Sequence, residues 1–228
     1  LGLARRTEEA YVAWIVRFIR ANGLRHPREL GGREVEAFLT TLALRHNVAP
    51  ATQNQALAAL LFLYREVLGQ QLPWMDDIRR AKKPRRLPVV LSREEVAAVL
   101  GELSGVHWLM ASLLYGSGLR LLECARLRLK DLDFSRAELT VRGGKGGRDR
   151  RTMLPQGLYG PLQAQVEEAR RVHRRDLDAG FGEVWMPSAL SVKFPNAARE
   201  PGWQYVFPSV SRSVDPRSGV VRRHHRDE

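Results

Sequence analysis

The stretch over residues 115–155 changes its hydrophobic period halfway along, and this change limits the folds that the chain can adopt. Up to Leu127 the apolar residues recur near helical spacing, behind Gly116 and Gly118, which permit a sharp turn into a helix. Beyond that point apolar and polar residues alternate, and glycines on both sides of Lys145 supply a tight turn. The pattern predicts a helix followed by a small β-hairpin sheet, with Lys145 at the hairpin tip.

Two charged residues stand at the start of the predicted helix. Arg120 and Glu123 are three positions apart, so their side chains share one face of its first turn. A planar guanidinium can hold an oxyanion through two hydrogen bonds, and a lysine can donate a proton to a leaving oxygen. The same residues also fit an ordinary solvated ion pair and, for Lys145, an ordinary turn lysine.

Three apolar stripes at helical spacing occupy the first third of the chain. The first predicted helix has Thr7 as its N-cap and ends near Gly23, and the second covers about residues 33–46. The third begins at Pro50 and ends at Gly69. We interpret the aromatic residues of these stripes as core, so the prediction is a compact helical unit.

Two segments of the amino-terminal half of the chain carry side chains suited to contacts with nucleic acid. The third helix starts with Thr52, Gln53 and Asn54, which are types that contact base edges or phosphates. Residues 76–90 are rich in proline and basic residues, which predicts a linker. That linker is either a solvated connector or a strap along a phosphate backbone. Its candidate contacts are Lys82, Lys83, Arg85 and Arg86.

The chain carries a formal net charge of +12, which indicates a polyanionic partner. Nucleic acid is the first candidate and an anionic membrane the second. No apolar run approaches the ~20 residues that span a bilayer, and the basic residues are not gathered on one amphipathic helix. We therefore predict a DNA partner and no membrane.

Cys124 is the single cysteine, so no disulfide can form within the chain, which fits a reducing cytoplasm. It lies among leucine and alanine one residue after Glu123. This setting favours a small buried core residue over a nucleophile.

The remaining chain alternates helices with a proline-rich segment. Ser92 is predicted to cap a helix, and residues 158–179 form a long charged one. Residues 185–216 form a short segment that is rich in proline. Their second half gathers three aromatic residues, Trp203, Tyr205 and Phe207. These rings either stack on unpaired bases beside basic residues or alternate along a short strand packed on the domain.

The G-x-R-x-x-E helix, the D-L-D-F strand and the G-K-G-G-R-D-R-R hairpin, in this order, resemble the catalytic domain of the tyrosine site-specific recombinases, the phage integrase family. The resemblance implies that Arg120 contacts the scissile phosphate, that Lys145 is the general acid for the leaving 5′-oxygen, and that Glu123 supports the site. The segments TEEAYVAWIVRFI and ATQNQALAALLFLYREVLG look like the family's helical, SAM-like core-binding domain. The implied fold is mainly α with a small β-sheet.

The string KFPNAAREPGWQYVFPS, followed by SVDPRSGVVRRHH, is similar to the insertion of integron integrases. That resemblance implies recombination of gene cassettes between a duplex attI site and a folded single strand of attC, in the bacterial cytoplasm, by a tetramer. The residues in the matching places for flipped bases are Trp203, Pro216, His224 and His225. No metal or nucleotide cofactor is implied, and the two histidines show no ligand spacing to Cys124 or His173.

The resemblance predicts a domain order of a core-binding domain at 1–75, the linker at 76–90, and the first part of a catalytic domain at 91–228. Neither the family's H-x-x-R motif nor a convincing nucleophilic tyrosine is found before Glu228, so the chain as given is expected not to cleave DNA. The alternatives are a non-catalytic DNA-binding module and another tyrosine recombinase of the phage or Xer type.

Overall fold

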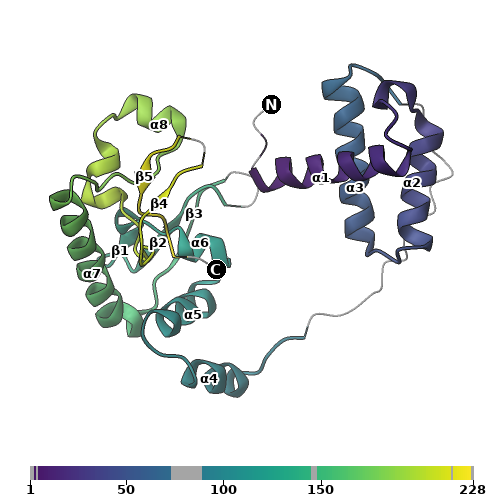
Figure 1. Ribbon diagram of the computed structural model, residues 1–228. Helices are drawn as coiled ribbons and strands as arrows, with labels where there is room; N and C mark the ends of the chain where they lie inside the picture. Colours follow the sequence, from purple (N-terminus) through teal and green to yellow (C-terminus); the bar gives the residue numbers. More distant parts are fainter. Residues whose placement is uncertain (1–2, 4, 73–88, 145–147, 217, 227–228) are drawn as a thin grey trace. The chain divides into compact units, whose positions relative to one another are not determined.

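The computed structural model describes residues 3, 5–72, 89–144, 148–216 and 218–226. Within these ranges the chain is mostly helical with small antiparallel sheets, as the sequence predicts (Figure 1). It divides into one compact unit, Leu1–Val89, and a second, Val90–Glu228. Each has a hydrophobic core of its own.

The first unit is built from helices that pack through their apolar stripes. Their bounds are α1 (Arg5–Ala21), the 3-10 turn η1 (Pro27–Glu29), α2 (Gly32–Leu44), α3 (Pro50–Phe62) and the π-helical turn η2 (Leu63–Val67). The prediction that Thr7 caps the first helix is wrong, because Arg5 and Arg6, both good helix formers, already belong to it. Gly23 and Gly69 follow helix ends with φ of 68° and 65°, the left-handed conformation that favours glycine.

Aromatic side chains form the centre of this first core, as predicted. Phe18 is fully buried and packs edge-on against Phe38, with ring centroids 5.5 Å apart. The Tyr64 hydroxyl lies 3.0 Å from the carbonyl oxygen of Pro27 and 2.9 Å from that of Leu30. Burial raises the pKa of Tyr64 to about 12, so its hydroxyl stays neutral and ties η2 to η1.

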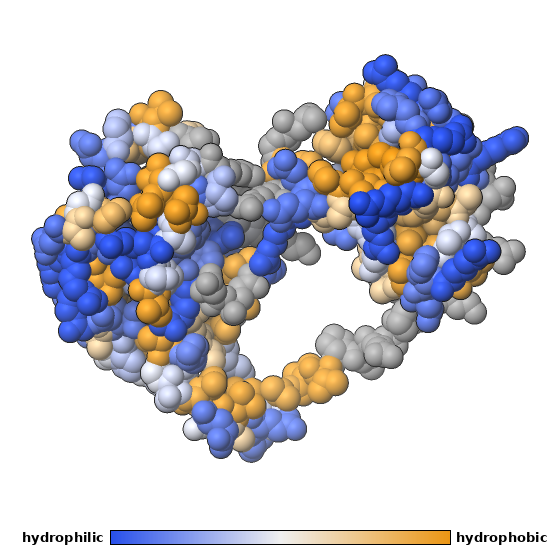
Figure 2. All heavy atoms as spheres, in the orientation of Figure 1, coloured by the Kyte–Doolittle hydropathy of each residue, from blue (hydrophilic) through white to orange (hydrophobic). Residues whose placement is uncertain are grey.

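The second unit begins with helices that lead into the predicted helix and hairpin of residues 115–155. Ser92 caps the first of them as predicted: its Oγ accepts from the Glu95 N–H at 3.2 Å, while the Glu95 carboxylate accepts from the Ser92 N–H at 2.7 Å. The bounds are α4 (Arg93–Gly101), α5 (Gly105–Ser117), α6 (Leu121–Ala125) and α7 (Tyr159–Asp178). Hydrophilic atoms cover the outer side of α7 (Figure 2).

A small antiparallel sheet lies in this unit in the order β1-β2-β3, as the alternation predicts. Its strands are β1 (Leu132–Asp133), β2 (Glu138–Val141) and β3 (Arg150–Met153). Leu139 pairs with Leu132 on one side and with Thr152 on the other. Leu139 and Val141 are buried beside Leu113 of α5, so the sheet and α5 share one core.

The proline-rich segment folds as short turns on the same unit. Its elements are α8 (Ser188–Lys193), the 3-10 turns η5 (Ala197–Arg199) and η6 (Pro201–Trp203), and β4 (Ser213–Val214), which pairs antiparallel with β5 (Val221–Arg222). Tyr205 and Phe207 are core residues, which fits the alternative that these rings pack on the domain. The alternating strand is wrong: Gln204 and Val206 are buried too, because this segment lies in the interior and the Val206 N–H donates to the Leu127 carbonyl at 2.8 Å.

Candidate active site and nucleic-acid interface

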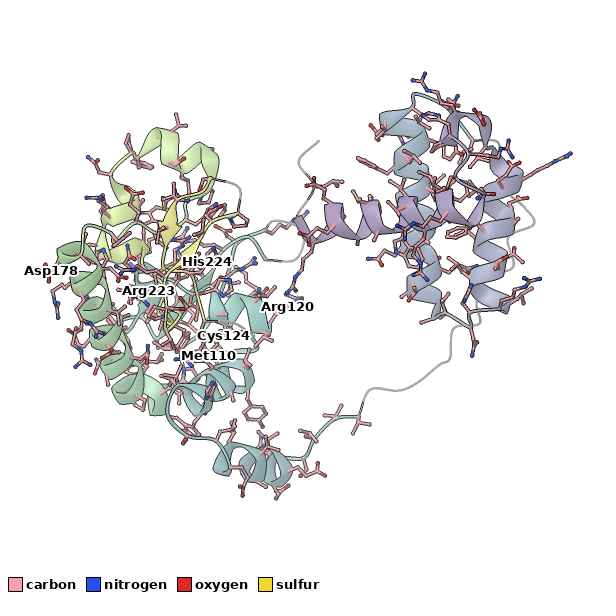
Figure 3. All side chains as sticks on the ribbon, in the orientation of Figure 1. Met110, Arg120, Cys124, Asp178, Arg223 and His224 are labelled. Atoms are coloured by element: carbon pink, nitrogen blue, oxygen red, sulfur yellow. The ribbon has the colours of Figure 1, made fainter. Side chains whose placement is uncertain are left out.

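Arg120 lies at the sharp turn between α5 and α6. Gly118 ends α5 with φ of 62°, a backbone conformation that costs a glycine nothing sterically. Arg120 is the N-cap of α6, a short helix that buries Cys124 and Ala125. The Arg120 side chain is 59% exposed and projects outward from the start of α6 (Figure 3).

The Glu123 carboxylate holds Arg120 together with a second arginine, Arg150 of β3. Its Oε1 accepts a hydrogen bond from Nη1 of each arginine at 2.8 Å. Its Oε2 accepts from the Arg120 backbone N–H at 2.9 Å and from Arg150 Nη2 at 2.7 Å. The Glu123 side chain is only 9% exposed. The hydrogen bonds from Arg150 and then from Arg120 outweigh burial and lower the Glu123 pKa to about 2.

The base of the β2–β3 hairpin lies directly against this carboxylate. A Cβ added at Gly144 would be 3.4 Å from Glu123 Oε1 and 3.2 Å from Arg150 Nη1. The Gly144 N–H donates to the Arg148 carbonyl at 3.1 Å, which closes the hairpin below its tip. Lys145, the predicted general acid, follows Gly144 in sequence and lies outside the described residues.

This arrangement suits a phosphate oxygen. Two guanidinium groups surround one carboxylate, so the cluster carries a net charge of +1. Within the described residues, the Arg120 guanidinium donates to a protein acceptor through Nη1. Its other N–H groups face solvent and can donate to a ligand. Charge-assisted bonds from such donors to an oxyanion are shorter and stronger than neutral ones.

Sequence reasoning missed Arg150 because it lies 27 positions from its partner Glu123. The sequence signal for Arg150 was the register of the predicted hairpin. Arg150 pairs with Val141, the last residue of β2 before the glycine turn, so its side chain lies at the base of the hairpin. A basic residue at that position was visible, but the carboxylate that it meets was not.

A second cluster gathers Trp203 with cations that the sequence analysis did not single out. Trp203 is half-buried at the end of η6, and the Lys130 ammonium lies 2.6 Å from the centroid of its ring. The buried Arg128 guanidinium lies 5.4 Å from that ring and 4.8 Å from the Tyr205 ring. Burial, followed by the charge of Arg142, lowers the Lys130 pKa to about 8.

The two predicted histidines join the same cluster through Tyr205. The His224 ring stacks on Tyr205 with centroids 5.9 Å apart and an interplanar angle of 21°. The His225 ring meets Tyr205 edge-on at 5.6 Å. Both histidines are half-buried. Pro216 is exposed in the connection between β4 and β5.

The predicted contacts of the first unit are only partly described. Thr52 is half-buried and Asn54 is exposed, both within the first two turns of α3. Gln53, between them, is buried, and its Nε2 donates to the Leu39 carbonyl at 3.0 Å, so it is a packing residue. The linker candidates lie outside the described residues, namely Lys82, Lys83, Arg85 and Arg86.

Cys124 is a core residue, as predicted. It is fully buried, and burial raises the pKa of its thiol to about 12, so the nucleophilic thiolate is not populated. Among the residues that the structure describes, no group of histidine, cysteine, aspartate and glutamate is arranged to hold a metal ion. Over the same described ranges, no helix has the length and apolar character needed to cross a membrane.

Two family models match this chain. Residues 1–74 match the phage integrase N-terminal SAM-like domain, and residues 90–215 match the phage integrase family. Together they cover both units.

Curated relatives match over nearly the whole chain. An integrase/recombinase of Escherichia coli is 50% identical over 225 residues, which cover 99% of this chain and 67% of the relative. A protein of the same description from Pseudomonas aeruginosa has the same identity and coverage. Tyrosine recombinase XerA of Thermococcus onnurineus is 32% identical over 170 residues, or 73% of this chain and 57% of the relative. The chain thus spans about two thirds of the length of the first two relatives.

Solved structures of similar fold are recombinases in complex with DNA. XerH bound to a palindromic difH substrate has a TM-score of 0.51 at 20% identity, covering 71% of this chain and 52% of XerH. The Tn1549 transposon integrase bound to transposon right-end DNA has a TM-score of 0.52 at 15% identity, covering 74% and 61%. At these identities the likeness is one of fold.

Proposed function

This chain belongs to the phage integrase family of tyrosine recombinases, and we propose that it acts in site-specific DNA recombination with Arg120 bound to the scissile phosphate. The observation that carries the proposal is an exposed Arg120 guanidinium fixed by the buried, ionised Glu123 carboxylate. A side chain that is already oriented loses little conformational freedom when it binds a phosphate.

In the proposed reaction a tyrosine oxygen, a role to which we assign none of the tyrosines in residues 1–228, forms a bond to the phosphorus while the bond to the DNA 5′-oxygen breaks. The pentavalent transition state gains negative charge on its non-bridging oxygens, and Arg120 donates hydrogen bonds to that charge. Lys145 donates a proton to the leaving oxygen. Gly144, directly before Lys145, lies beside Glu123, which supports a common site for the two cations.

We assign positioning on DNA to the first unit and the linker. Thr52 and Asn54 stand within the first two turns of α3, where the helix dipole also favours phosphate oxygens. The basic residues of the linker add contacts that do not depend on sequence. The net charge of +12 supports a polyanionic partner for both parts.

We further propose integron-type substrates, a duplex attI site and a folded single strand of attC, recombined by a tetramer. The cluster of Trp203, His224 and His225 around Tyr205 supports this assignment, because aromatic faces stack on bases that have left the duplex. The Lys130 ammonium lies over the Trp203 ring, and Trp203 also packs against the small core of Val184, Met186, Ala197 and Tyr205, so an extrahelical base would stack on the part of the ring that stays exposed.

Binding to three DNAs at several salt concentrations tests the proposal. The probes are an attC-type bottom-strand hairpin, its complementary strand and a random duplex. The expected result is a preference for the bottom-strand hairpin that weakens roughly tenfold in Trp203→Ala, since stacking on one base contributes about 1–3 kcal/mol. Trp185→Ala, which removes a tryptophan of the same unit that is 42% exposed, is the control.

An Xer-type recombinase that acts on duplex sites is the second candidate, and the match to XerA is compatible with it. It predicts a preference for a specific duplex and no effect of Trp203→Ala. Equal and steeply salt-dependent binding to all three DNAs would contradict both candidates, because charge alone would then account for binding.

A further inference from the structure

Arg150 connects the hairpin to the turn that carries Arg120. It opens β3, and its Nη2 also lies 3.4 Å from the carbonyl oxygen of Gly118, at the end of α5. Two residues further along β3, the Thr152 hydroxyl donates to the Ser117 carbonyl at 2.8 Å. The strand therefore holds the α5–α6 turn at two successive positions of its partly buried face.

The contacts of Arg150 with Glu123 form a fork. Nη1 donates to Oε1 at 2.8 Å and Nη2 to Oε2 at 2.7 Å, so both carboxylate oxygens are engaged by one planar group. Arg120 contributes a single side-chain bond, from Nη1 to Oε1. The rotation of the carboxylate about its own axis is thus set mainly by Arg150.

We propose that Arg150 is a positioning residue for Arg120. By holding both oxygens of Glu123, it prevents that carboxylate from turning to engage Arg120 through two bonds, and it keeps the remaining Arg120 donors available for a DNA phosphate. The inference rests on the proposed function in one respect, namely that Arg120 binds such a phosphate.

The position of Arg150 adds a consequence for the hairpin. Because Arg150 belongs to the β2–β3 hairpin, a displacement of β3 would break its two hydrogen bonds with Glu123 and leave that carboxylate held by Arg120 alone. The orientation of Arg120 therefore depends on the position of the hairpin. Among the described residues, the charged groups that face Glu123 are Arg120 and Arg150, both cations.

The first test is DNA affinity of the full chain for the attC-type hairpin, measured by fluorescence anisotropy. Arg151→Gln is the matched control, because Arg151 is the next residue on β3, is 67% exposed and meets Glu138 instead of Glu123. Both substitutions remove one positive charge. Arg150→Gln is expected to weaken binding roughly tenfold more than Arg151→Gln, the size of one charge-assisted hydrogen bond. Equal losses in the two variants would overturn the proposal.

The second test is additivity. If Arg150 acts through Glu123 on Arg120, then in an Arg120→Ala background Arg150→Gln should weaken binding no more than Arg151→Gln does. An additional tenfold loss in that background would mean that Arg150 contacts DNA independently, which contradicts a positioning role.

The third test needs no DNA. Titration of the Glu123 side-chain carbonyl by NMR should show its pKa rise from about 2 toward its ordinary value in Arg150→Gln, with a smaller rise in Arg150→Lys and none in Arg151→Gln. Arg150→Lys keeps the charge on a single nitrogen but not the planar fork, and it serves where Arg150→Gln does not fold. A Glu123 pKa that stays low in a folded Arg150 variant refutes the positioning contact. If the pKa rises but Arg120→Ala binds DNA as tightly as the parent chain, the proposed function fails instead.

Discussion

Glu123 and Asp176 are two nearly buried carboxylates of the same unit, and each holds two arginines. Asp176 of α7 engages Arg223 through a fork, with Oδ2 2.6 Å from Nε and Oδ1 2.8 Å from Nη2, and Arg212 at 3.5 Å. Arg223 also donates to the carbonyls of Ser209 and Val210 at 2.8 Å. Arg223 is 17% exposed. All three side-chain nitrogens of Arg223 are thus used within the protein.

Around Glu123 the outcome differs, although the chemistry is the same. Arg150 makes the fork, and Arg120 keeps most of its guanidinium in solvent at 59% exposure. In Figure 3 Arg223 lies within the ribbon of its unit, whereas Arg120 stands at the outer edge of α6. Both sites contain an arginine–carboxylate pair, so the pair alone does not indicate a binding site. The candidate binding site is the one whose arginine keeps hydrogen-bond donors exposed to solvent.

The largest expected effect is on stability at Asp176. Asp176→Asn leaves Arg223 and Arg212 without their counter-charge in a poorly solvated place, which should cost about 3 kcal/mol. The unit should melt roughly 10 °C lower in a thermal scan. DNA binding of the folded variant should be unchanged. A loss of DNA affinity without a loss of stability would break the comparison.

Glu123→Gln should have a smaller, pH-dependent effect. The folded Glu123 pKa, about 2, lies below its ordinary 4.5, so the carboxylate contributes stability above pH 4.5 that is lost as the pH falls toward 2. With partial solvent screening of its arginines, the contribution at pH 7 should be about 2 kcal/mol. Urea unfolding of both proteins between pH 2 and 7 should show the difference shrinking at acid pH. A constant difference would contradict the assignment.

Gly144→Ala tests how closely the hairpin approaches Glu123. The added methyl group would lie 3.1 Å from the Arg148 carbonyl oxygen and 3.2 Å from Arg150 Nη1, so the hairpin base must shift by a few tenths of an ångström. We expect a cost of about 1 kcal/mol, measured by chemical unfolding. Gly157→Ala is the control, because a Cβ there meets nothing within 4 Å.

The smallest expected effect on stability belongs to Arg120→Ala. Its ion pair with Glu123 is exposed on the arginine side, so the cost should stay within about 0.5 kcal/mol. The same change should lower the salt dependence of DNA binding by about one counterion. Arg120→Ala and Asp176→Asn thus have opposite effects, one on binding and one on stability, and a strongly destabilised Arg120→Ala would remove the distinction between the two sites.

Much of the fold follows from local sequence. Helical spacing of apolar residues predicted the helices, Ser92 as an N-cap predicted the start of α4, and glycines predicted the helix ends at Gly23 and Gly69. Alternation predicted the β2–β3 hairpin. These signals are readable because each depends on neighbours within one or two turns. The start of α1 was missed because a good N-cap residue competes with equally good helix formers before it.

The pairing of Arg120 with Glu123 was also local, since three residues of one helical turn bring the two side chains together. Sequence alone therefore determined the candidate phosphate ligand and its carboxylate. Only the tertiary structure decided that Arg150 binds both oxygens of that carboxylate. It also decided that Arg223, 47 positions away, binds Asp176, and that Lys130 lies over the Trp203 ring. Such contacts depend on how separate elements pack against one another, and no period or cap in the sequence encodes the meeting of two distant side chains.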